Sequence, residues 1–215
     1  MDKAWEIIAS LFLYTAKSGM NTSMIPISKS QLRIDLHQRR DQYKKTYDLE
    51  TSGQAILDNL TSAAIIPPEA VIGSYWPVKS EADARPLLSY FYDQGHVCAL
   101  PVVQASQKPL LFREWRPGHL LICGIYNILT PDENAPLVIP SVLFVPVLGF
   151  DLHGNRLGHG KGYYDRTLET LRAHHSVIAI GIAFDCQEVE AIPYLDHDEP
   201  MNYIITPTRV IEIKK

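Results

Sequence analysis

The sequence of 215 residues is poor in cysteine and has no cysteine pair at metal-binding spacing. Its three cysteines, Cys98, Cys123 and Cys186, lie far apart, and none belongs to a CxxC motif. A disulfide framework usually needs an even number of cysteines, and a structural zinc site needs closely spaced ligands. Neither is expected here. We predict three buried cysteines that act as small hydrophobic residues, in a reducing cytoplasmic compartment.

Long hydrophobic runs are also missing. The longest apolar stretch near the start, Ile7 to Ala16, is half the roughly 20 residues that a membrane-spanning helix requires. A signal peptide would begin with basic residues, and a mitochondrial transit peptide would contain arginine before Arg33. We therefore expect no membrane partner and interpret residues 1–27 as an N-terminal extension, an accessory helix and linker. Alternatively, Met24 is the natural start.

A strong excess of one charge is absent too, because the net charge is −4. That balance predicts no nucleic-acid partner. Basic residues nevertheless cluster between 29 and 45, where S-x-x-Q at Ser28 indicates the start of a helix. Along this helix Lys29, Arg33 and Arg40 fall on one line, which is either a solvated basic face or an edge facing a small anionic ligand. The expected buried stripe beside them consists of Leu32, Leu36, Tyr43 and Tyr47.

Helical and strand-like segments alternate along the rest of the chain, with no internal repeat. We expect helices at about 28–47, 53–64, 83–94 and 162–173, and strands at 70–76, 96–103, 110–115, 138–147, 177–183, 203–206 and 209–213. A connection rich in Pro, Gly and Asn occupies 116–136. This alternation predicts a single α/β domain over residues 28–215, with a mostly parallel central sheet flanked by helices.

Neither common nucleotide-binding motif is present. A P-loop needs Ser or Thr after its lysine, but Gly162 follows Lys161, and the glycines here repeat as G-x-G-x-G rather than G-x-G-x-x-G. What the chain does have is a glycine-rich stretch, Phe150 to Arg166, between a predicted strand and a predicted helix. Backbone N–H groups and a helix N-terminus at such a place can hold a phosphate.

The side chains of this glycine-rich stretch suit a nucleotide. Arg156 and Lys161 bring positive charge, and Tyr163 with Tyr164 brings flat apolar surfaces. Asp165 could bind Mg²⁺, which usually takes one or two carboxylates plus substrate phosphates. The alternative is a glycine-rich turn in which Asp165 pairs with the neighbouring Arg166.

Two other groups could contribute to a site. The acidic run Asp196 to Glu199 is a solvated loop or, if the fold brings it to Asp165, part of a metal site. Trp76 and Glu81 could stack on a flat heterocycle and accept its N–H groups, or could be a core residue and a charge at a helix N-terminus. No Ser-His-Asp or Cys-His nucleophile arrangement stands out.

Taken together, these segments resemble the 5-formyltetrahydrofolate cyclo-ligase (5,10-methenyltetrahydrofolate synthetase) family. The family signature F-D-x-x-G-x-R-L-G-x-G-x-G-Y-Y-D matches residues 150–165 at every fixed position. The early K-x-x-x-R matches Lys29 and Arg33, and Y-W-P-x-x-x-E matches residues 75–81. The late H-D before I-I-T matches residues 197–198 and 204–206.

The resemblance implies the fold of sugar-phosphate isomerases and CoA transferases, and an ATP- and Mg²⁺-dependent enzyme. Its substrate would be 5-formyltetrahydrofolate or a polyglutamylated form, and the protein would be a monomer or weak dimer. The implied catalytic residues are Arg156 and Lys161. ATP would contact Lys29, Arg33, Arg156, Leu157, Gly158, His159, Gly160, Lys161, Gly162, Tyr163 and Tyr164. Folate would contact Trp76, Glu81, His159, Gly160, Lys161, Gly162 and Tyr163, and Mg²⁺ would bind Asp165 and Asp198. The alternatives are a sugar-phosphate isomerase-like enzyme and a non-catalytic folate-binding protein on the same fold.

Overall fold

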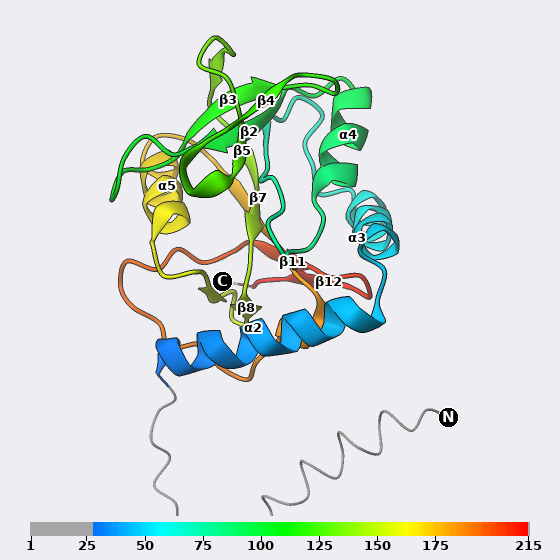
Figure 1. Ribbon diagram of the computed structural model, residues 1–215, viewed down its shortest axis with the longest axis vertical. Coiled ribbons are helices and arrows are strands. Elements are labelled where there is room, and N and C mark those ends of the chain that lie inside the picture. The colour runs from blue at the N-terminus through cyan, green and yellow to red at the C-terminus, as the bar shows by residue number, and fades with distance from the viewer. Residues whose placement is uncertain (1–27, 215) are drawn as a thin grey trace, which may run out of the picture.

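Eight strands form one mixed sheet in the computed structural model, which describes residues 28–214 (Figure 1). Their order is β12–β11–β10–β7–β1–β2–β3–β6, with β1 Ile72–Gly73, β2 Cys98–Val102, β3 Leu111–Trp115, β6 Leu137–Val138, β7 Val142–Pro146, β10 Ile178–Ile182, β11 Tyr203–Ile205 and β12 Val210–Glu212. The inner strands β11, β10, β7, β1 and β2 are parallel to one another, and β12, β3 and β6 are antiparallel to their neighbours. This confirms the predicted α/β fold with a mostly parallel sheet.

Among the described residues, four α-helices surround the sheet. They are α2 Lys29–Thr46, α3 Leu49–Ala63, α4 Arg85–Asp93 and α5 Tyr163–Arg172. Ser28 caps α2 as its S-x-x-Q pattern predicts, because its side chain accepts a hydrogen bond from the backbone N–H of Gln31. Helix α3 begins four residues earlier than expected, since the Asp48 side chain caps it through the backbone N–H of Thr51.

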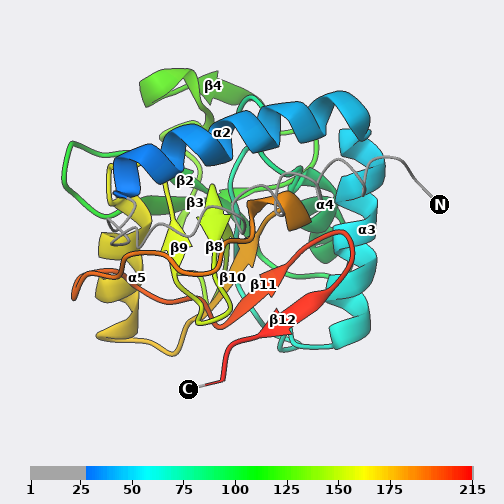
Figure 2. The same cartoon turned by 90° about the horizontal axis from the view of Figure 1, so that it is seen from below.

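The helices cover the sheet unequally (Figures 1 and 2). α3 and α4 pack on one face, where Ile56, Leu60 and Leu87 join the core formed with β1 and β7. α5 packs on the other face through Leu168. Helix α2 runs below this assembly, and its Leu32 and Leu36 pack on Leu148, Leu157 and Ile192. The position of α2 brings its basic edge to one end of the strands.

Several segments differ from expectation. The strand expected at 138–147 is two strands, β6 and β7, separated by Pro140, which has no N–H to donate to a ladder. The expected connection at 116–136 contains a hairpin of β4 Leu121–Cys123 and β5 Leu129–Pro131 around the 3-10 turn η1 Ile125–Asn127. A second hairpin, β8 Gly149–Phe150 with β9 Arg156–Leu157, takes up the first part of the glycine-rich stretch, and residues 158–162 form the glycine-rich loop between β9 and α5. A short 3-10 turn, η2 Asp185–Gln187, follows β10.

Two burial predictions need correction. The buried stripe of α2 ends before Tyr47, which is 57% exposed because the helix stops at Thr46 and leaves that ring at the surface, stacked on Tyr43. Cys98 is buried and Cys186 half-buried, but Cys123 is exposed on β4. Burial raises the pKa of the Cys98 thiol to about 12. Within residues 28–214 no helix is long and apolar enough to cross a membrane, and the extension predicted for residues 1–27 lies outside the described residues.

Candidate functional site

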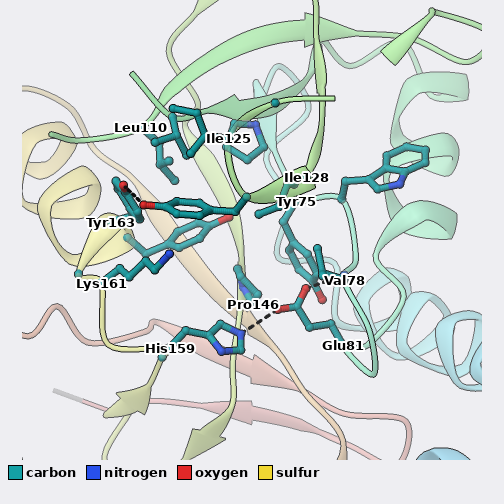
Figure 3. Close-up of a pocket in the computed structure, with 18 of the residues that line it drawn as sticks. Tyr75, Val78, Glu81, Leu110, Ile125, Ile128, Pro146, His159, Lys161 and Tyr163 are labelled. Carbon is teal, nitrogen blue, oxygen red and sulfur yellow. Dashed lines mark hydrogen bonds and ion pairs between the residues drawn. The ribbon is translucent and has the colours of Figure 1, made fainter. Parts of the chain in front are cut away.

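A cavity of about 670 Å³ opens at the carboxyl ends of β1, β2 and β7 (Figure 3). Tyr75 and Trp76 line it just after β1, Pro101 and Val102 at the end of β2, and Pro146 at the end of β7. The chain passes from β1 to β2 on one side and returns to β7 on the other side of β1. Such a reversal of strand order is where open α/β sheets bind ligands.

Every site residue predicted from the sequence lines this one cavity. They are Lys29, Arg33, Trp76, Glu81, Arg156, Leu157, Gly158, His159, Gly160, Lys161, Gly162, Tyr163, Tyr164, Asp165 and Asp198. They come from α2, from the segment between β1 and α4, from β9 and the glycine-rich loop after it, from the first turn of α5, and from the loop before β11. The fold therefore gathers segments that are far apart in the sequence into one place.

The glycine-rich loop is held against α2. The Arg33 Nε donates a hydrogen bond of 2.9 Å to the Gly158 carbonyl oxygen. Gly160 has φ +87°, and a Cβ added there would lie 3.2 Å from the Arg33 guanidinium carbon. Glycine at 160 therefore meets two needs, a backbone conformation that other residues rarely adopt and a close approach to a cation.

The cavity receives one edge of α2. Lys29, Arg33, His37 and Arg40 line it, and Arg40 is 2% exposed. The Lys29 Nζ donates to the Asp198 Oδ2 at 2.5 Å. Of the two interpretations of the basic line, the structure therefore favours an edge that faces a ligand. His37 was not predicted as a site residue, although it continues the four-residue spacing of Lys29 and Arg33.

The loop that carries Asp198 lies beside Asp165, the other predicted metal ligand. The backbone N–H of Glu199 approaches the Asp165 Oδ1 at 3.4 Å, which brings the loop carrying Asp198 beside α5. The alternative interpretation, in which Asp165 pairs with Arg166, is wrong. The partner of Asp165 is Arg156, whose Nη2 donates to Oδ1 at 2.6 Å. The Arg156 side chain can reach Asp165 because β9 ends beside the first turn of α5.

The acidic groups of the cavity fit a partly hydrated Mg²⁺. Asp165 and Asp198 both line the cavity, each beside one cation of the chain. No cluster of three or more potential metal-ligating side chains occurs among residues 28–214. Asp165 and Asp198 thus form a pair of carboxylates rather than a closed cage, and Mg²⁺ usually takes one or two carboxylates together with phosphate oxygens and water. The Nε of Arg156 is buried with no hydrogen-bond partner in the described chain, so a donor is left over at this place.

Glu81 presents its carboxylate to the opposite part of the cavity. One oxygen, Oε2, accepts the backbone N–H of Val78 at 2.9 Å, and the other, Oε1, lies 3.1 Å from the His159 Nε2 (Figure 3). Glu81 is buried, with 8% exposure. Trp76 meets both earlier interpretations, because it lines the cavity and also packs on the core, with its ring 6.5 Å from that of Trp115.

The β4–β5 hairpin adds an aromatic side chain that sequence analysis missed. The Lys161 Nζ lies 3.0 Å from the centre of the Tyr126 ring, and the Tyr126 and Tyr163 hydroxyls are 3.1 Å apart. Hydrogen bonding from Tyr163 and Lys161 lowers the Tyr126 pKa, whereas the same hydroxyl pair raises the Tyr163 pKa. The Pro, Gly and Asn content of this segment indicates only a loop. The one signal of a further site residue is the aromatic side chain of Tyr126.

Comparisons with known proteins agree on one family. A sequence model of the 5-formyltetrahydrofolate cyclo-ligase family matches residues 26–207. The 5-formyltetrahydrofolate cyclo-ligase of Escherichia coli K12 is 31% identical over 182 residues, covering 82% of this chain and 99% of that protein. The cyclo-ligase of Mycolicibacterium smegmatis is 33% identical over 199 residues, covering 87% of this chain and 98% of that protein.

Solved structures are similar as well. The NMR structure of Aquifex aeolicus 5,10-methenyltetrahydrofolate synthetase superimposes with a TM-score of 0.71 at 27% identity, covering 87% of this chain and 93% of that one. The Mycoplasma pneumoniae 5,10-methenyltetrahydrofolate synthetase superimposes with a TM-score of 0.62 at 21% identity, covering 84% of this chain and 99% of that one. The second likeness concerns the fold alone.

Proposed function

The chain belongs to the 5-formyltetrahydrofolate cyclo-ligase family, and we propose that it converts 5-formyltetrahydrofolate and ATP into 5,10-methenyltetrahydrofolate, ADP and phosphate, with Mg²⁺. The observation that carries this proposal is the meeting of the family's glycine-rich signature, the basic edge of α2 and two carboxylates in one cavity. A sugar-phosphate isomerase-like enzyme and a non-catalytic folate-binding protein are not favoured, because the family model and the curated relatives named above are cyclo-ligases.

The substrate supplies the nucleophile in this reaction. The formyl oxygen attacks the γ-phosphorus of ATP, an O–P bond forms, and ADP leaves with the electron pair of the broken P–O bond. The 10-nitrogen of the folate then attacks the activated carbon and loses its proton. Phosphate leaves with the C–O electron pair, and the five-membered ring is closed. A site for this chemistry needs no protein nucleophile, in keeping with the sequence.

The chain's own cations suit the charge that develops on phosphoryl oxygens. Lys29 and Arg33 on α2, and Arg156 and Lys161 around the glycine-rich loop, all line the cavity. Fixed cations and backbone N–H groups accelerate phosphoryl transfer by positioning the groups and stabilising the transition state. We assign ATP to Lys29, Arg33 and residues 156–164, with Arg156 and Lys161 as the catalytic pair.

Asp165 and Asp198 are the residues that would hold Mg²⁺. When bound, the ion supplies charge neutralisation to the phosphates. The Asp165 and Asp198 carboxylates accept hydrogen bonds from Arg156 and Lys29, respectively. Each carboxylate on the cavity wall is thus partly neutralised by a cation of the chain.

Trp76, Glu81 and residues 159–163 are assigned to the folate. Glu81 offers Oε1 to the cavity as a hydrogen-bond acceptor, and the buried position of the carboxylate strengthens such a bond. The aromatic and apolar cavity wall, which includes Trp76, Ile125 and Tyr163, suits a flat heterocycle. Polyglutamylated substrates, a monomeric or weakly dimeric state and a cytoplasmic location remain predictions from the sequence.

A single assay tests the proposal. The purified protein is incubated with 5-formyltetrahydrofolate, ATP and Mg²⁺, and near-ultraviolet absorbance of the methenyl product is followed over time. We expect the absorbance to rise in the complete mixture and to stay constant in mixtures that lack either ATP or Mg²⁺. Absence of a rise, with the folate still bound, would support a non-catalytic folate-binding protein instead.

A further inference from the structure

The second half of α2 holds the turn that carries Glu81. The Ser80 hydroxyl accepts a hydrogen bond of 3.2 Å from the Arg40 Nε and donates one to the Asp41 Oδ1. One helical turn further on, the Lys44 Nζ donates to the Lys79 carbonyl oxygen at 3.0 Å. Both residues immediately before Glu81 are therefore attached to the same helix.

The attached turn has an unfavourable backbone conformation. Lys79 has φ +59°, in the left-handed region that residues with a Cβ rarely adopt. Strained residues of this kind persist only where the surrounding contacts determine them, and they gather at functional sites. The Lys79 backbone conformation is held by the hydrogen bond from Lys44 and by the hydrogen bonds of the neighbouring Ser80.

The strained turn fixes how the Glu81 carboxylate is presented. Oε2 accepts the backbone N–H of Val78, and the backbone N–H of Glu81 donates to the Val78 carbonyl oxygen. Oε1 is left facing the cavity, where it meets His159. One carboxylate oxygen thus holds the turn together while the other is available to a ligand.

A buried arginine at position 40 is energetically unfavourable if its side chain only supports the turn that carries Glu81. Arg40 is 2% exposed, and among residues 28–214 its hydrogen-bond partner is Ser80, with no carboxylate at ion-pair distance. Burying a guanidinium that reaches a carboxylate only through a hydroxyl, here from Ser80 to Asp41, is unfavourable, and an apolar residue would fill the same space with a smaller desolvation penalty. Arg40 also lines the cavity beside His37. A function in the site accounts for the cost.

We propose that Arg40 is a positioning residue for Glu81, which it acts on through Ser80, with Asp41 and Lys44 completing the brace. This inference rests on the proposed function, in which Glu81 binds the folate. Lys29 and Arg40 are eleven residues apart, or about 16 Å along one helix. Helix α2 then holds Lys29 and Arg33, which are assigned to the nucleotide, near its N-terminus, and supports Glu81, which is assigned to the folate, from its second half.

Two variants and their combination test the brace. Ser80→Ala removes the linking hydroxyl, and Arg40→Met removes the charge with little change in volume. We expect each to raise the KM for 5-formyltetrahydrofolate by roughly tenfold, the scale of a hydrogen bond involving a charged group, while the KM for ATP stays within about twofold. Because Arg40 acts through Ser80, the double variant is expected to be no worse than the more affected single variant.

Arg39→Met is the matched control. It makes the same substitution one residue away, where the side chain is exposed and paired with Asp35 on the helix surface, and it is expected to leave both KM values unchanged. Thermal melting of every variant with and without ATP shows whether the fold and the nucleotide site are intact.

Three results would overturn the brace. They are an unchanged folate KM in Ser80→Ala, additive effects in the double variant, and equal rises in the KM of both substrates. If Ser80→Ala leaves the folate KM unchanged while Arg40→Met raises it, Arg40 touches the folate itself. The unmodified protein separates the two proposals: if it neither turns over nor binds 5-formyltetrahydrofolate, the proposed function fails, whereas normal turnover with an unaffected Ser80→Ala variant rejects only the brace.

Discussion

Arg156 donates to Asp165 at 2.6 Å, and this ion pair joins the end of β9 to the first turn of α5. The Arg156 side chain is 5% exposed and its Nε has no partner in the described chain, while Asp165 also faces the cavity. The same carboxylate thus stabilises a buried cation and stands where a metal ion could bind. The two roles can be separated by experiment.

Asp165→Asn should raise the Mg²⁺ concentration needed for half-maximal turnover. Loss of a residue that only supports a metal ligand commonly costs 10- to 100-fold in affinity, so loss of a ligand should cost at least about tenfold. The measurement is a Mg²⁺ titration of the initial rate, with Asp196→Asn as the control because Asp196 is exposed on the loop that carries Asp198. An unaltered titration with a lower melting temperature would assign Asp165 to the ion pair alone.

Lys161→Ala should lower kcat by about 10²- to 10³-fold, the effect of removing one electrostatic donor from a transition state. The Lys161 ammonium lies over the Tyr126 ring. The matched control is Lys108→Ala on an exposed loop outside the cavity. Steady-state kinetics that show the same kcat for both variants would reject the catalytic role.

Gly160→Ala should weaken ATP binding beyond what backbone strain explains. Both Gly160 and Gly118 have positive φ, +87° and +81°, but only Gly160 has a close neighbour, the Arg33 guanidinium. Alanine should therefore cost each site about 1–2 kcal/mol of stability, and only Gly160→Ala should raise the KM for ATP. Equal KM values in the two variants would show that the approach of Arg33 to the loop is unrelated to the nucleotide.

Stability should fall as the pH is lowered, in part through His37. Burial, Arg40 and His159 lower the His37 pKa from its ordinary value, against a smaller opposing effect of Asp41. The unfolded chain therefore binds a proton near pH 6.5 that the folded chain takes up only at lower pH, so the free energy of unfolding decreases between these two values.

Urea unfolding at pH 7.5 and pH 5.5 measures this dependence. His37→Gln should reduce the difference between the two pH values, whereas His174→Gln, at an exposed position after α5, should preserve it. An equal pH dependence in the wild type and in His37→Gln would mean that other groups cause it.

The sequence predicted the residues of the cavity better than the elements that carry them. Motif residues such as Gly160 and Lys161 are neighbours in the chain, and the alternation of strands and helices places the segments after β1 and β7 at one edge of the sheet. Pro140 is a visible signal that the expected strand is divided, because proline has no N–H to donate, whereas the pairing of β6 with β3 and of β7 with β1 and β10 depends on tertiary contacts. The predicted roles of the site residues in ATP, folate and Mg²⁺ binding remain predictions.

The omissions concern residues whose importance depends on tertiary contacts. Tyr126 lies in a hairpin that composition describes only as a loop, and its contact with Lys161 joins two segments separated by the five strands β5 to β9. Arg40 was placed on the basic line, but nothing in helical periodicity indicates that this guanidinium is buried against Ser80. The choice of Arg156 as partner of Asp165 likewise depends on the β8–β9 hairpin.

The ion pair between Lys29 and Asp198 spans 169 residues. Contacts of such high sequence separation form late, because the entropy of closing the long loop is lost before any contact compensates for it. On the ribosome, Lys29 emerges long before Asp198 exists. The end of the cavity that carries this ion pair is therefore completed only once nearly the whole chain has been made.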